Sequence, residues 1–154
     1  MKWKPSQSAA ANARRALPKL AEKYFRAGRK AAAGKVSPKA LHQFRIATKK
    51  FRYALELFRP VYGASLERRL KSLRELQDVL GKINDHHTVL EMLAKDKELE
   101  AKLERSIKRN SKHFRKIWNA FDAEGEFQQW KNYLNREQSR PLASARPRQR
   151  RRAS

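Results

Sequence analysis

The sequence predicts an all-α protein, and three observations support this fold class. Glycine and proline, the residues that interrupt helices, number only five and six in 154 residues. No stretch shows the sustained two-residue alternation that is typical of a strand. Apolar residues instead recur three and four positions apart along most of the chain. The length predicts one domain with a substantial core, and the absence of cysteine excludes disulfides and cysteine metal sites.

The first helix is predicted to run from about Ser8 or Pro18 to Ala33. Pro18 either starts this helix or kinks it, because proline has no backbone N–H to donate. Gly34 is expected to end it, since glycine adopts the left-handed conformation that follows many helices.

The second helix is predicted to begin after Ser37, which can cap it while Pro38 occupies the first helical position. It should continue to about Phe58, ahead of Pro60. The stretch "RPVYGAS" that follows is expected to be a loop.

The rest of the domain is predicted to hold further helices, which brings the total to about five or six. In "ND" at 84–85, a side chain is expected to cap a short helix that follows it. The further helices cover approximately residues 66–83, 84–94, 97–121 and 127–135. "SRPLASARPRQRRRAS", residues 139–154, offers little to bury and is expected to be a disordered basic tail, so residues 1–138 form the domain.

The second helix carries a row of basic residues that is unusual in its surroundings. On a helical wheel one broad face is apolar, and four basic side chains fall together within an arc of about 80°. This basic stripe consists of His42, Arg45, Lys49 and Arg52. On its far side lies a second apolar strip formed by Ile46, Tyr53 and Leu57. An ordinary solvated face has polar neighbours, so we expect the stripe to line a groove between helices.

The stripe needs partners for its charge. Glu56 can pair with Arg52 four residues away, but one carboxylate cannot satisfy three cations and a histidine. An external anion is therefore the expected partner. The alternative is that carboxylates from other helices neutralise the stripe.

Two other helices repeat the pattern opposite clean apolar faces. These ladders contain Arg15, Lys19, Lys23, Arg26 and Lys30 in the first helix, and Lys102, Arg105, Arg109, Lys112 and Lys116 in the helix at 97–121. A merely solvated face is an equally good interpretation of each ladder. Single-sign ladders nevertheless favour a long anion, because solvated helices usually mix charges.

The helix at 66–83 is expected to bury six apolar residues, with Arg74 and Gly81 beside this seam. Glycine within a helix destabilises it by about 1 kcal/mol relative to alanine. We therefore expect Gly81 to permit close helix approach or access of a ligand to the backbone. The buried residues are Leu66, Leu70, Leu73, Leu76, Leu80 and Ile83.

At these residues the chain resembles a known family. "LHQFRIATKKFRYALELF", a loop and then "LKSLRELQDVLGKINDHHTVLEML" are similar to the CHAD family, the conserved-histidine α-helical domain. The resemblance covers residues 37–93 and joins H-x-x-R-x-x-x-K-x-x-R-Y to L-Q-x-x-L-G-x-x-N-D at the expected distance. It implies an antiparallel helical bundle that binds inorganic polyphosphate through a basic channel in the cytoplasm, often on polyphosphate granules.

The resemblance also carries over site residues. The histidine of the family falls on His42, and its basic positions fall on Arg45, Lys49, Arg52 and Arg74. Typical members hold two such helical repeats, whereas this chain holds one. A two-fold homodimer could supply the second wall of the channel.

The charge of +23 independently indicates a polyanion partner, either polyphosphate, nucleic acid or an anionic membrane surface. No apolar run has the length of a membrane span. Of these three, we predict that inorganic polyphosphate is the partner. The predicted binding residues are His42, Arg45, Lys49, Arg52, Arg74, Lys19, Arg26, Arg109 and Lys116. The alternative is non-specific RNA or DNA binding, which the tail and the tryptophans could serve.

Catalysis is not expected. His86, His87 and Glu91 give only a weak metal-site signal, with no activated nucleophile or glycine-rich phosphate loop beside them. We therefore predict a binding protein without catalytic residues, metal or cofactor.

Overall fold

The computed structural model describes residues 4–34, 36–92 and 96–136 and shows an all-helical bundle. No strand occurs in these ranges, which confirms the predicted fold class. The elements are α1 (Ala9–Ala32), α2 (Pro38–Leu57), α3 (Arg59–Tyr62), the 3-10 turn η1 (Gly63–Ser65), α4 (Leu66–Met92), α5 (Lys97–Phe121) and α6 (Glu126–Asn135).

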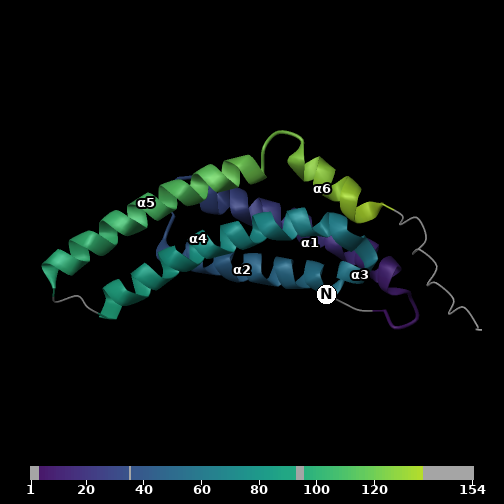
Figure 1. The fold of residues 1–154 in the computed structure, drawn as a ribbon, viewed down its shortest axis with the longest axis horizontal. Coiled ribbons are helices and arrows are strands. Elements are labelled where there is room, and N and C mark those ends of the chain that lie inside the picture. The colour runs from purple at the N-terminus through teal and green to yellow at the C-terminus, as the bar shows by residue number, and fades with distance from the viewer. Residues whose placement is uncertain (1–3, 35, 93–95, 137–154) are drawn as a thin grey trace, which may run out of the picture.

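The bundle is organised around α4. This helix packs against α2 on one side and against α5 on the other, while α1 packs against α2 and α6 (Figure 1). The helices α4 and α5 form a long hairpin whose far end projects beyond the other helices, and α6 lies at the opposite end. Because α2 and α4 are the walls of the expected groove, their contact positions the candidate site.

Serine side chains cap the first two helices. The Oγ of Ser8 accepts a hydrogen bond from the backbone N–H of Ala11 at 3.2 Å, and Ser37 does the same for Ala40 at 3.2 Å. Of the two predicted starts for the first helix, the one at Ser8 is therefore confirmed. Pro18 lies inside α1 rather than at its beginning.

The predicted cap at residues 84–85 is wrong, because α4 continues without a break from Leu66 to Met92. The side chain of Asn84 does not turn back to its own backbone. Its Oδ1 lies 2.5 Å from Nδ1 of His42 on α2, so a contact with another helix replaces the local one.

The segment predicted as a loop at residues 59–65 contains α3 and the turn η1. A tertiary contact holds this segment in a regular conformation, since the hydroxyl of Tyr62 donates to the carbonyl of Leu134 at 2.8 Å. The basic tail at residues 139–154 and the predicted domain boundary at 138 lie outside the described residues.

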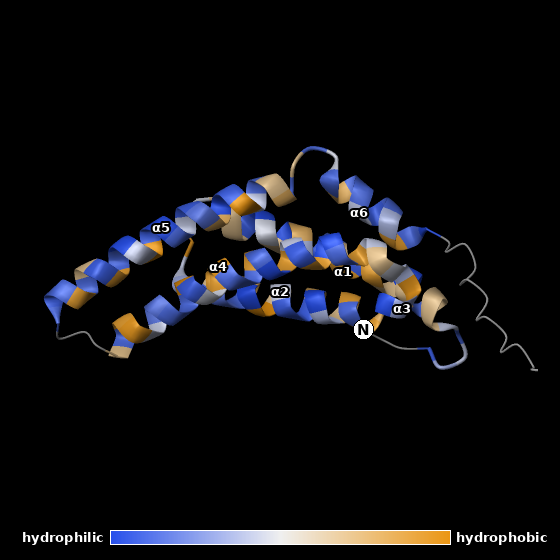
Figure 2. Cartoon of the chain, in the orientation of Figure 1, coloured by the Kyte–Doolittle hydropathy of each residue, from blue (hydrophilic) through white to orange (hydrophobic). Residues whose placement is uncertain are grey.

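The core is rich in aromatic residues that meet between α1, α2, α5 and α6. Hydrophobic and hydrophilic residues are intermixed along the long helices, as expected of amphipathic helices (Figure 2). Gly28 makes room for one of these rings, because a Cβ there would lie 1.9 Å from the ring of Trp118. The predicted seam of α4 is confirmed, since all six of its apolar residues are buried. The central rings are those of Tyr24, Phe25, Phe44, Phe51, Trp118, Phe121 and Trp130.

Candidate anion-binding groove between α2 and α4

The basic stripe lies on the side of α2 that faces α4. Its four members, His42, Arg45, Lys49 and Arg52, are all partly buried. The more distant cations chosen from the sequence differ in this respect. Lys19 and Arg26 on α1, and Arg109 and Lys116 on α5, are all exposed.

Three members of the stripe contact α4 directly. Residues later in α2 contact residues earlier in α4, as in an antiparallel pair of helices. His42 meets Asn84. Arg45 lies over Gly81, where a Cβ would be an ordinary 3.9 Å from Nε of the arginine.

The third contact completes this antiparallel series. Nε of Arg52 donates to Oε1 of Gln77 at 3.0 Å. The residues on α4 that face the stripe therefore include polar side chains and a glycine. We call the strip between these two facing rows the groove.

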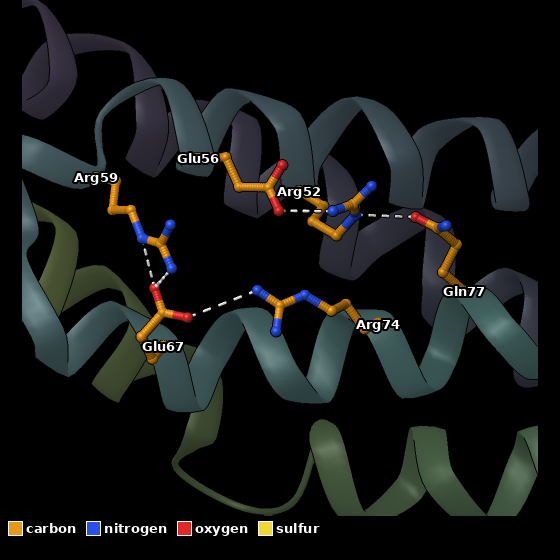
Figure 3. A network of polar contacts seen from close by, with 6 residues as sticks. All are labelled: Arg52, Glu56, Arg59, Glu67, Arg74 and Gln77. Carbon is orange, nitrogen blue, oxygen red and sulfur yellow. Dashed lines mark hydrogen bonds and ion pairs between the residues drawn. The ribbon is translucent and has the colours of Figure 1, made fainter.

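At the Arg52 end of the groove, carboxylates accompany the arginines (Figure 3). Nη1 of Arg52 donates to Oε1 of Glu56 at 2.6 Å, which confirms the predicted pair. Nε of Arg59 donates to Oε1 of Glu67 at 2.6 Å, and Nη2 of Arg74 lies 3.6 Å from Oε2 of the same glutamate. Two carboxylates are thus divided among three guanidinium groups.

Glu67 is held in its charged form by these arginines. The hydrogen bond from Arg59 lowers the pKa of the Glu67 carboxyl, and the charges of Arg59 and Arg74 lower it further. Since this glutamate contacts both arginines, carboxylates offset part of the positive charge at the Arg74 end of the groove.

The middle of the groove, unlike its Arg52 end, holds cations that have no carboxylate partner in the described residues. Within the residues that the structure describes, neither Arg45 nor Lys49 forms an ion pair. Nε of Arg45 is buried and has no hydrogen-bond partner in that part of the chain. A partly buried cation without a partner destabilises the fold, so these two positions are where an anion would be most favourable.

At the His42 end the groove opens into a pocket of about 300 Å³. Its charged or titratable lining consists of Lys39 and His42 from α2 and of His87 and Glu91 from α4. Burial lowers the pKa of His87, and the neighbouring Glu91 opposes this shift. Across the described ranges, no group of three or more His, Asp or Glu residues is placed to hold a metal ion.

The structure brings Arg74 to the groove, but it does not bring the α1 and α5 ladders there. The helix α4 lies between α2 and α5 (Figure 1). Lys116 and Arg109 on α5 therefore belong to a different surface, and the exposed cations of α1 point to solvent.

Sequence reasoning missed four residues that shape the groove. Gln77 and Asn84 fall with Arg74 and Gly81 at spacings of three and four, so a helical wheel of the third helix would have placed them on one face. Arg59 and Glu67 gave no such signal, because Arg59 belongs to the segment predicted as a loop and Glu67 follows that segment.

Comparison with known proteins gives one result. A family model described as the CHAD domain matches residues 1–94. No curated protein and no solved structure matches the chain. Of the helices within the described ranges, none is both long enough and apolar enough to cross a membrane.

Proposed function

The chain belongs to the CHAD domain family, and on that premise we propose that it binds inorganic polyphosphate in the groove between α2 and α4. The observation that carries this proposal is the unneutralised middle of the groove. Arg45 and Lys49 are partly buried on the α4 side of α2 without a carboxylate partner in the described residues. A bound polyanion would supply the missing negative charge.

The form of the groove suits this ligand. Polyphosphate is a flexible chain that carries negative charge on every unit and offers no base to stack or read. From His42 to Arg52 a helix rises ~15 Å, which spans several phosphate units. Arginine can hold phosphate oxygens through two parallel hydrogen bonds, whereas lysine acts as a point charge.

We assign the remaining candidate residues two roles. Arg52 and Arg74 would bind phosphate at the end where Glu56 and Glu67 compete for them. The exposed cations would attract the flanking parts of a long chain from solvent, since charge steers association over distance. These residues are Lys19, Arg26, Arg109 and Lys116.

In this proposal the protein binds its ligand and catalyses no reaction. Its place would be the cytoplasm, on polyphosphate granules where these form. Its net charge of +23 also makes nucleic acid a competitor that must be tested.

Direct competition tests the proposal. Long-chain polyphosphate, double-stranded DNA and RNA are offered to the protein at physiological salt. Polyphosphate should be preferred at least about tenfold, which corresponds to about 1.4 kcal/mol. Its affinity should fall steeply as salt rises, because binding releases counterions. A preference for duplex DNA would contradict the proposal.

We also propose that two copies associate around the ligand. Tyr53 and Leu57, which border the stripe, are 51% and 67% exposed although both are large and apolar. A second copy placed on this strip would cover it and bring a second groove opposite the first. Two strongly basic chains repel, so the dimer should depend on bound polyphosphate.

A further inference from the structure

We propose that Asn84 is a positioning residue that fixes the tautomer of His42 and thereby makes phosphate binding at this end of the groove depend on proton uptake. This inference rests on the proposed function. It assigns a regulation to the site that the groove alone does not imply.

The contact between the two side chains supports the first step. Nδ1 of His42 lies 2.5 Å from Oδ1 of Asn84. An amide oxygen only accepts hydrogen bonds, so Nδ1 must carry the hydrogen and donate it. In a neutral imidazole only one nitrogen carries hydrogen. Nε2 of neutral His42 is therefore a bare lone pair.

The second step follows from the chemistry of phosphate. A lone pair repels the oxygens of a polyphosphate chain, whereas an N–H with a positive charge attracts them. With its Nδ1 occupied by Asn84, His42 can donate to phosphate only after Nε2 takes up a proton. Binding would then draw a proton from solvent, and by reciprocal linkage lower pH would strengthen binding.

The surroundings of His42 include groups of both signs. The pocket beside it contains Lys39 from α2, which disfavours a further positive charge, and Glu91 from α4, which favours it. His87 lines the same pocket, and its lowered pKa keeps it neutral to lower pH. Arg45 lies one turn further along α2. A polyanion between these cations adds negative charge, which makes protonation of His42 more favourable.

The tautomer is tested first, without any ligand. Nitrogen-15 NMR of the protein at pH 8 should show His42 with hydrogen on Nδ1, assigned by its loss in His42→Gln. Asn84→Ala, which favours the helix, should shift His42 towards the Nε2–H form. Asn84→Asp, which keeps an acceptor, should retain the Nδ1–H form. A wild-type His42 with hydrogen on Nε2 would overturn the inference and leave the proposed function intact.

Affinity is tested second, with a polyphosphate chain of defined length at pH 5.5 and pH 8.0. Wild type should bind about tenfold more tightly at the lower pH, the effect of one charge-assisted hydrogen bond. His42→Gln should lose most of this ratio. Asn84→Ala should also reduce it, because neutral His42 could then donate through Nε2. His113→Gln on α5, an exposed histidine, is the matched control and should keep the ratio.

These outcomes separate the two proposals. Tight polyphosphate binding with the same pH ratio in wild type and His42→Gln would overturn the proton coupling alone. Failure of wild type to bind polyphosphate at either pH would instead remove the proposed function, whatever the NMR result.

Discussion

At the scale of single residues, Lys49 and Lys50 provide a matched pair. They are neighbours on α2, but Lys49 is partly buried on the stripe and Lys50 is exposed on the polar side. Lys49→Glu should weaken polyphosphate binding at least about tenfold, since it turns an attraction within the groove into a repulsion. Lys50→Glu makes the same charge change and should alter affinity at most about twofold, as an exposed charge does in salt.

The comparison is made by titration with polyphosphate at physiological salt, with circular dichroism to verify helicity. Adding Arg45→Glu to Lys49→Glu should abolish tight binding. Equal losses in Lys49→Glu and Lys50→Glu would mean that diffuse charge, rather than the groove, holds the polyanion.

Two glycines within helices should respond to alanine in opposite ways. At Gly28 the new Cβ would overlap the ring of Trp118, so Gly28→Ala should lower the free energy of unfolding by about 1–3 kcal/mol. At Gly81 the new Cβ would meet only Arg45 at an ordinary distance, so Gly81→Ala should raise it by up to about 1 kcal/mol. Chemical denaturation measures both. A stabilised Gly28→Ala protein would show that the core around Trp118 is packed differently.

At the scale of elements, the two halves of α4 should differ in local stability. All seven of its buried residues lie between Leu66 and Ile83. Beyond that point, residues 84–92 and residues 97–110 of α5 make up the far part of the hairpin, and neither stretch contains a buried residue. Helical stability in proteins comes mainly from such burial, so the outer half of α4 depends on a weaker contact.

Hydrogen exchange measures this difference within one continuous helix. Amides of residues 86–92 should exchange at least about tenfold faster than those of residues 70–80, because a local opening suffices to expose them. Equal protection along the whole of α4 would contradict this. Asn84 and His42 lie at the boundary between the two halves, so bound polyphosphate should slow exchange just beyond it.

At the scale of the whole molecule, the prediction concerns assembly. Sedimentation with and without short polyphosphate chains should show a monomer that becomes a dimer when ligand is present, because ligand binding and dimerisation are linked reciprocally. Leu57→Gln, which keeps the net charge, should weaken the dimer by removing apolar surface from the interface. Gln43→Asn, on the exposed polar side of α2, is the control. A strict monomer that still binds with full affinity would show that one chain builds the entire site.

The sequence by itself determined the all-α class, the faces of the helices that form the core and the basic stripe on α2. Each of these features follows from the residue periodicity of a single helix, which can be read without knowing how the helices pack against one another. The cap at Ser37 acts locally too, and for this reason the start of α2 could be predicted from it.

Only the tertiary structure decided the parts that require two helices. Asn84 could cap its own helix or bond to another, and the contact with His42 on α2 selected the second role while α4 continued past it. Glu67 likewise meets Arg59 only because the chain turns between α2 and α4. Whether a cation is neutralised or left for a ligand depends on which side chains the packing brings within reach, and residues distant in sequence give no periodic signal of that.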